Sequence, residues 1–206
     1  MFLKLSKLKK LMKESYKTCG LWVGHRAAVA GVCEESYYIS GGWWLIDFHA
    51  EYMPKEVKAA VIELSGDLPE VGKLFVARNK EAPQYEFESP AFYAKEISQK
   101  PSLKYEVTNL SEDTGTHSYR YLYCDIGPIK LVENSIVELI DIGAVDTTTG
   151  ECYPVGPYCE SEGDRRNIVW KNNTTILVAF AAKSEDGAIE AYRNSIGQVI
   201  HKHWKK

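Results

Sequence analysis

The chain lacks the sequence motifs that usually identify a reaction. It has no Gly-rich phosphate loop, no nucleophile elbow, no H-E-x-x-H segment and no EF-hand pattern, each of which would place a known chemistry on a known element. Its five cysteines include no C-x-x-C pair, which excludes a zinc ribbon and a thioredoxin-type motif. We therefore expect no metal site and no cofactor. We expect buried, reduced thiols, with a Cys152–Cys159 pair in an oxidising compartment as the alternative.

Long apolar runs are also missing. The longest, Ile176 to Ala182, is far shorter than the roughly 20 residues that span a bilayer. Lysines interrupt every apolar stretch of the opening segment MFLKLSKLKKLMK, so the hydrophobic region of a signal peptide is absent. These two features predict a cytoplasmic protein with no membrane partner.

An excess of positive charge is absent as well. The 25 Lys and Arg residues are outnumbered by 28 Asp and Glu, for a formal net charge of −3. Nonspecific coating of nucleic acid is therefore not favoured for the whole chain, although a local basic patch stays open. With 206 residues, 45% of them hydrophobic, the chain is long enough for one large or two small globular domains.

The patterns that are present predict an α+β fold, with antiparallel sheets, helices packed on one face and a duplicated strand–turn–strand–helix unit. The N-terminal half, residues 1–78, opens with an amphipathic helix that ends near Gly20. It continues with strands, a helix over MPKEVKAAVIELSG that starts at Pro54 and ends at Gly66, and the strand KLFVAR. Residues 79–101 form a proline-containing connection, in which PAFYAKEISQK is compatible with a short helix.

The C-terminal half, residues 102–206, is predicted to repeat this order, so that the two halves form one compact domain. SLKYEVTNL is expected to be one strand, followed by a strand–turn–strand over HSYRYLYCDIGPIKLV and a short helix over ENSIVELID. Residues 146–166 are expected to form a long loop, and NIVWKNNTTILVAF a hairpin that turns at Asn172 and Asn173. A final helix is expected from Ser184 onward, before the basic end HKHWKK.

The segment YYISGGWWLIDFH predicts an aromatic hairpin. If Gly41-Gly42 is a two-residue turn, Ile39 pairs with Trp44 and Tyr38 with Leu45. Side chains alternate between faces along a strand. One face is then apolar core, and the other is a mixed face whose function is open, with these members: Tyr38, Ser40, Trp43, Leu45, Asp47 and His49.

Two kinds of site follow as hypotheses. Asp47 and His49 lie two residues apart on the mixed face, close enough for a carboxylate to orient an imidazole, and His25 is the candidate third group of a small enzyme. The bland alternative is a surface polar contact. For binding, the aromatic candidates are Tyr38 and Trp43, and the basic candidates for an anion or a nucleic-acid backbone are Lys7, Lys9, Lys10, Arg165 and Arg166.

The hairpin YYISGGWWLI, the following PKEV..AV..L helix and a second similar half resemble the DNA sliding clamps, the polymerase processivity factors. The resemblance covers about Leu21 to Lys183, although Ser40-Gly41 stands where Thr-Asp or Ser-Asp is commoner in the clamps. It implies a single clamp-like domain that closes a ring only as an oligomer. A composition rich in Lys, Glu, Tyr and Ile is also similar to that of phage or mobile-element products.

Together these observations favour a non-catalytic binding protein that acts through protein or DNA contacts. A small enzyme that uses the Asp47–His49 pair and a structural homo-oligomer are the alternatives.

Overall fold

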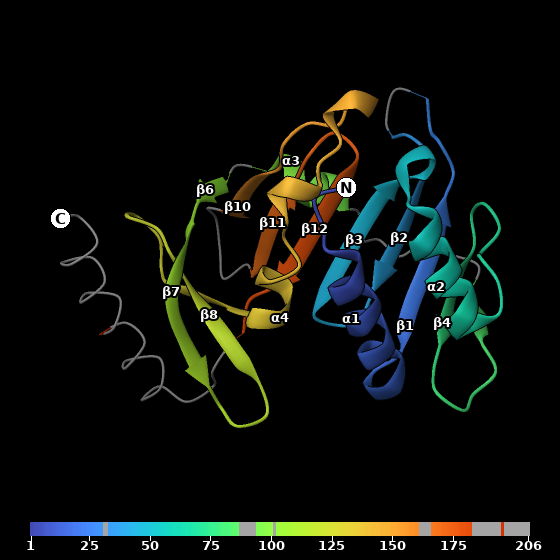
Figure 1. Ribbon diagram of the computed structural model, residues 1–206, viewed down its shortest axis with the longest axis horizontal. Helices are drawn as coiled ribbons and strands as arrows, with labels where there is room; N and C mark the ends of the chain where they lie inside the picture. Colours follow the sequence, from blue (N-terminus) through green and yellow to red (C-terminus); the bar gives the residue numbers. More distant parts are fainter. Residues whose placement is uncertain (31–32, 87–93, 101, 161–165, 183–194, 196–206) are drawn as a thin grey trace.

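The computed structural model describes residues 1–30, 33–86, 94–100, 102–160, 166–182 and 195, and it contains two antiparallel sheets (Figure 1). The larger sheet has nine strands in the order β5-β4-β1-β2-β3-β12-β11-β10-β6, and the smaller has three in the order β7-β8-β9. Strands from both halves of the chain therefore share the larger sheet. They meet where β3 pairs with β12.

The strands of the larger sheet are β1 (Leu21–Arg26), β2 (Ser36–Ser40), β3 (Trp44–His49), β4 (Leu74–Ala77), β5 (Gln84–Glu86), β6 (Ser102–Lys104), β10 (Val155–Glu160), β11 (Asn167–Lys171) and β12 (Thr175–Phe180). The smaller sheet consists of β7 (Glu106–Asp113), β8 (Ser118–Tyr123) and β9 (Lys130–Glu133). The helices are α1 (Leu5–Thr18), α2 (Lys55–Ser65), α3 (Ala94–Gln99) and α4 (Asn134–Val137).

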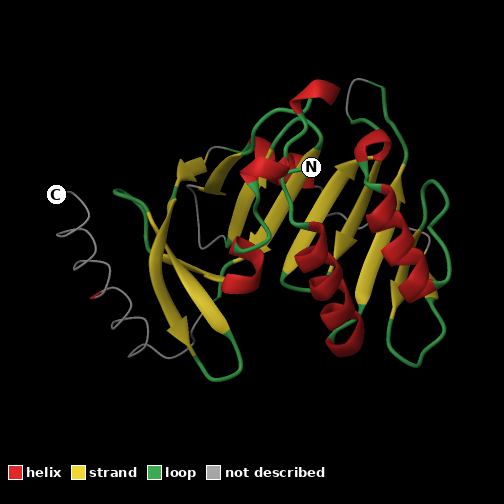
Figure 2. Cartoon of the chain, viewed as in Figure 1, coloured by secondary structure: helices red, strands yellow, loops and turns green. Residues whose placement is uncertain are grey.

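Helices cover both faces of the larger sheet. On one face α1 and α2 lie side by side over β1 to β4 (Figure 2), and the main core forms between them and the sheet around Trp44, Ile46 and Phe48. On the opposite face α3 contacts β3, β11 and β12, above a smaller cluster that includes Tyr38, Leu45 and Val178. The α+β class is confirmed, and α3 is the helix that departs from packing on one face.

The two long helices begin and end where their sequences predict. In α1 the stripe buries Leu8, Leu11 and Met12, because residues three or four apart share one side of a helix. In α2 the chain enters through Pro54 and leaves at Gly66. Among the described residues, neither these helices nor any other is long and apolar enough to cross a membrane.

Three segments differ from their predictions. The connection 79–101 contains the strand β5, which was not predicted, whereas its short helix α3 lies within PAFYAKEISQK as expected. SLKYEVTNL is not one strand: Tyr105 separates β6 in the large sheet from β7 in the small one, and its buried ring explains why the chain bends there. The segment 146–166 contains β10, in which only Pro157 and Cys159 are buried. The predicted helix from Ser184 onward lies outside the described residues, apart from Ser195.

The aromatic hairpin is present, but its register differs by two residues. Ser40 pairs with Leu45 and Ile39 with Ile46, so the connection has four residues and not two. Position 41 requires glycine, because a Cβ there would lie 2.1 Å from the Ser15 hydroxyl of α1. A shift of two preserves the predicted faces, except that Trp43 falls in the turn and packs against the main core.

The proposed repeat is matched in local order only. Both β2–β3–α2 and β8–β9–α4 are hairpins followed by a helix. The first hairpin belongs to the large sheet and the second to the small one. Whether the two units arose by duplication stays a prediction.

Candidate functional site

Two adjoining cavities lie at the ends of β1, β2 and β3, and we call them together the cleft. The larger has a volume of about 680 Å³ and extends toward α2, where Lys58 lines it. The smaller, of about 310 Å³, lies between α3 and the β11–β12 turn. The residues that line both are Cys33, Glu34, Glu35, His49 and Lys95. Volumes in this range are typical of ligand sites.

The floor of the smaller cavity is a hydrogen-bonded ion pair that spans three strands. Arg26 on β1 donates from Nη2 to Asp47 Oδ2 on β3 and to the Ser36 hydroxyl on β2, at 2.6 Å in both cases. The side chains of Arg26 and Asp47 are 10% and 6% exposed. A pair so deeply buried fixes the positions of both groups, because separating them would leave an uncompensated charge.

Two opposing effects act on the Asp47 carboxyl. Burial raises its pKa, and the nearby Arg26 guanidinium, the Ser36 hydroxyl and the more distant Lys95 lower it. Burial dominates, so the pKa lies above its ordinary value. Asp47 is therefore a buried acidic group with a raised pKa at the bottom of a polar cavity. Perturbed pKa values often mark functional sites.

Glu34 and Glu35 form the rim between the two cavities. Being consecutive in an extended segment, they point to opposite faces of the sheet. Glu34 Oε2 lies 2.8 Å from His49 Nε2 on β3, and Glu35 Oε1 lies 2.8 Å from His25 Nε2 on β1. The rim is thus held to the sheet by one histidine on each face.

His25 lies behind the rim and does not line the cleft. Its ring is buried, stacks on Tyr37 at 3.9 Å between centroids, and faces the Pro69 carbonyl through Nδ1 at 3.1 Å. Both ring nitrogens therefore face acceptors. Through these two contacts the His25 ring holds Glu35 against β1.

Lysines supply the remaining positively charged groups of the cleft. The Lys171 ammonium donates to the Ser98 carbonyl of α3 at 2.6 Å. Lys58 lies 5.4 Å above the Tyr37 ring and donates to the Ala50 carbonyl. Lys95 projects from α3 and lines both cavities. Each of these three side chains is half-buried.

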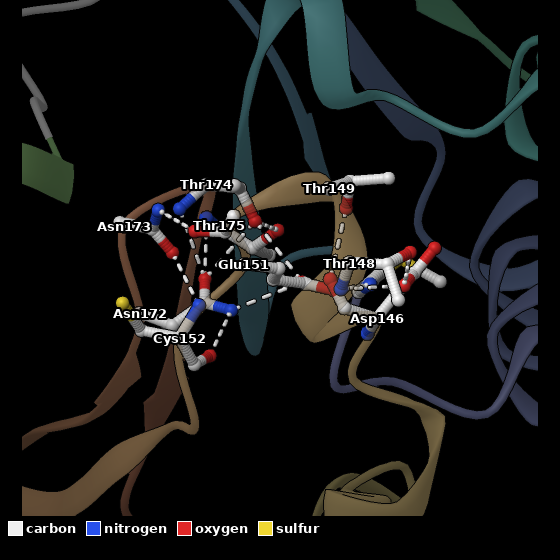
Figure 3. Close-up of polar contacts among 11 residues, drawn as sticks. Asp146, Thr148, Thr149, Glu151, Cys152, Asn172, Asn173, Thr174 and Thr175 are labelled. Atoms are coloured by element: carbon white, nitrogen blue, oxygen red, sulfur yellow. Dashed lines mark hydrogen bonds and ion pairs between the residues drawn. The ribbon is translucent and has the colours of Figure 1, made fainter.

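The β11–β12 turn forms one wall of the smaller cavity, and a buried glutamate stabilises it (Figure 3). Glu151 Oε1 accepts hydrogen bonds from Asn172 Nδ2 at 3.0 Å and from the Thr174 hydroxyl at 3.1 Å. Its Oε2 accepts from the Asp146 amide at 3.0 Å and pairs with the Met1 amine. Burial raises the pKa of Glu151, but these contacts outweigh it and lower the pKa overall.

Two of the three predicted catalytic candidates, Asp47 and His49, line the same cavity, but they do not pair with each other. His49 Nδ1 is buried and has no hydrogen-bond partner among the described side chains. Tyr38 lies under α3 in the smaller apolar cluster and is 7% exposed, so its surface is already covered. Trp43 is half-buried at the main core.

The basic candidates lie away from the cleft. Lys7 forms an ion pair with Glu138, and Lys13 of the same helix forms one with Glu63 at 3.1 Å. Carboxylates therefore already offset part of the positive charge on α1. Lys9 is half-buried and Lys10 is exposed. Arg166 is half-buried at the start of β11, and Arg165 lies outside the described residues.

Sequence reasoning did not identify four cleft residues: Arg26, Glu34, Glu35 and Lys171. Each is a single charged residue at or beside a strand end, and such residues are usually solvated. The usable signal was the spacing of Asp47 on a strand with apolar neighbours, because a buried carboxylate needs a cationic partner. Of the thiols, Cys124 and Cys159 are buried as predicted, Cys33 is half-buried in the cleft, and Cys19 and Cys152 are exposed.

The described residues contain no group of three or more His, Cys, Asp and Glu side chains arranged to hold a metal ion. Comparison of the chain with known protein families, with curated proteins and with solved structures finds no match.

Proposed function

We propose that this chain is a non-catalytic binding protein whose binding site is the cleft, and that it acts through contacts with a partner protein. The observation that carries the proposal is the pair of adjoining cavities above the buried Arg26–Asp47 pair. The floor and the rim are held by hydrogen bonds that form within the chain, so the cleft is pre-formed. A pre-formed site loses little conformational entropy when it binds.

The clamp-like, DNA-binding form of this hypothesis stays a prediction and has less support. Its basic residues, Lys7, Lys9 and Lys10, lie on α1 among carboxylates such as Glu138 and Glu14. The whole chain has a net charge of −3. A surface that neutralises several consecutive phosphates needs unopposed cations.

The small-enzyme hypothesis has one favourable observation: Asp47 and His49 share a cavity. Their contacts favour a supporting role instead. The Arg26 guanidinium is hydrogen-bonded to Asp47, and the Glu34 carboxylate contacts the Nε2 atom of His49. The Nδ1 atom of His49 is buried. A general base must reach the proton that it removes, and Asp47 Oδ2 and His49 Nε2 are already engaged by side chains of the same chain.

Selection from a random twelve-residue peptide library displayed on phage tests the proposal without assuming any ligand chemistry. Cys33 is half-buried and lines both cavities, so Cys33→Trp should fill the cleft. Cys152→Trp is the matched control, because Cys152 is an exposed cysteine that lines neither cavity. We expect the selected peptides to bind the wild type and the Cys152→Trp variant, and to lose at least about tenfold in affinity for the Cys33→Trp variant.

Circular dichroism and thermal melting establish that both variants are folded before affinities are compared. The proposal is wrong if the selection enriches no peptide, or if the enriched peptides bind the Cys33→Trp variant as tightly as the control.

A further inference from the structure

We propose that the occupant of the cleft is an acidic segment of a partner protein, whose carboxylates are bound by Lys58 and Lys171. This inference rests on the proposed function and adds the chemistry of the ligand. Its basis is a difference between the negative and the positive groups of the cleft. The negative groups Asp47, Glu34 and Glu35 lie against basic side chains of the same chain, and Lys58 and Lys171 are bound by backbone carbonyls.

Each carboxylate of the floor and rim has a basic side chain of the same chain as its partner. Asp47 lies against the Arg26 guanidinium, Glu34 against His49 and Glu35 against His25. The His25 ring also contacts the Pro69 carbonyl, so the position of Glu35 is fixed against β1. Glu51 is exposed at the outside of the larger cavity, where water and salt screen its charge.

Lys58 and Lys171 have backbone carbonyls as their partners, in contrast to these carboxylates. Within the part of the chain that the structure describes, neither Lys58 nor Lys171 has a carboxylate within ion-pair distance. Lys171 donates to the Ser98 carbonyl, and Lys58 to the Ala50 carbonyl at 3.5 Å. An ammonium has three protons to donate. Half-buried ammonium groups with donors to spare are stabilised by an anion that enters the cleft.

The positions of the lysines suit a segment that passes over the rim. Lys58 comes from α2 and lines the larger cavity, Lys171 comes from β11 and lines the smaller, and Lys95 of α3 lines both. An extended chain with acidic residues at intervals can therefore meet a cation in each cavity. Charge complementarity of this kind fixes the register and the identity of a partner.

A polypeptide fits these walls better than a nucleic acid. A phosphate backbone carries its charges at short, regular spacing, and it would bring some of them against Glu34 and Glu51. A peptide can place a carboxylate at each lysine and a neutral residue at the rim. We therefore assign the cleft to an acidic peptide segment.

Fluorescence anisotropy with three labelled probes of equal length tests this assignment. The probes are a ten-residue peptide of alternating Glu and Ser, the same peptide with Lys in place of Glu, and a ten-nucleotide oligothymidylate. We expect the Glu/Ser peptide to bind most tightly at low salt and to weaken as salt is added. Amide chemical-shift changes in the labelled protein should fall on Cys33 to Ser36 and on the β11–β12 turn.

The decisive variant is Lys58→Gln combined with Lys171→Gln. It should weaken the binding of the Glu/Ser peptide by about tenfold or more, since each lysine contributes a charge-assisted hydrogen bond. Lys9→Gln combined with Lys10→Gln removes the same formal charge from α1, which does not line the cleft. This matched control should change the affinity by less than about twofold, because α1 is distant from the cleft and salt screens its charges.

Three results would overturn the acidic-segment assignment: tightest binding of the Lys/Ser peptide, tightest binding of the oligothymidylate, or equal losses in the two double variants. Absence of binding by the Glu/Ser peptide would overturn it as well. The library selection with Cys33→Trp separates this failure from failure of the proposed function, because peptides of any charge can then still be selected for the cleft.

Discussion

The Arg26 guanidinium on β1 crosses the neighbouring strand β2 and donates to the Asp47 carboxylate on β3, with Nη2 and Oδ2 2.6 Å apart. Ser36, which lies between them on β2, accepts from the same nitrogen. One cation therefore connects three adjacent strands at the floor of the cleft. Both the stability of the sheet end and the shape of the cleft depend on this pair.

Arg26→Met should reduce the free energy of unfolding by about 3–5 kcal/mol, because it leaves the buried Asp47 carboxylate without its cation. Urea unfolding at pH 7 measures the change. Lys13→Met is the control, since it breaks an ion pair with Glu63 whose side chains are 50% and 64% exposed, and it should cost less than about 1 kcal/mol.

The double variant Arg26→Met, Asp47→Leu should recover most of the stability that Arg26→Met loses, because no unpaired charge stays buried. A double variant as unstable as Arg26→Met alone would show that packing of the arginine stem, and not the charge of Asp47, accounts for the loss.

Glu151→Gln should lower stability at neutral pH by roughly 2 kcal/mol, since three hydrogen-bond donors and the Met1 amine lose a charged acceptor. The pKa of Glu151 is lowered in the folded protein. Its stabilising contribution is therefore present above the unfolded pKa of about 4.3 and is lost as the pH falls through the folded pKa. The difference between wild type and variant should shrink from pH 6 to pH 3.

Chemical unfolding at a series of pH values measures that difference. Glu63→Gln, at an exposed position, is the control and should leave the pH profile close to that of the wild type. A constant difference for Glu151→Gln across the acid range would contradict the assigned role of its carboxylate.

Gly24→Ala should destabilise the β1–β2 pair, because a Cβ at this position would lie 2.0 Å from the Tyr38 ring. Tyr38 is 7% exposed in the cluster beneath α3, so its ring has little room to move. We expect a loss of about 1–3 kcal/mol, measured by thermal unfolding. Gly143→Ala, where the nearest atom is the Asp141 carboxylate oxygen at 3.3 Å, should cost less.

Adding Tyr38→Leu to Gly24→Ala removes the ring that clashes and should restore part of the lost stability. If the double variant unfolds at a lower temperature than Gly24→Ala alone, the contact between Gly24 and Tyr38 is not the cause.

Periodic patterns predicted the elements that pack against the main core. The apolar stripes of α1 and α2 distinguish the buried face of each helix from its exposed face. The alternation of side chains along β2 and β3 does the same for the two faces of the sheet. The faces of the aromatic hairpin were predicted despite the wrong turn, since a register error of two residues moves no side chain to the other face.

The cleft was predictable only in part. Asp47 and His49 were singled out from their spacing, but their partners come from β1 and from the segment before β2, and spacing in one strand says nothing about which strand lies next to it. Arg26 and Ser36 approach Asp47 because β1, β2 and β3 are consecutive in the sheet. The division of SLKYEVTNL between two sheets likewise depends on tertiary packing at Tyr105. The local alternation of apolar and polar residues carries no information about that packing.

The pairing of β3 with β12 has a consequence for synthesis of the chain. The ribosome completes β3 early, but the strand that covers its free edge, Thr175–Phe180, is among the last described segments to emerge. Until then Leu45 and Ile46 belong to an open, apolar strand edge, which other chains can extend. Closure of the sheet must therefore wait until Thr175–Phe180 has emerged, and a ribosome that stalls before Thr175 would release a protein prone to aggregation.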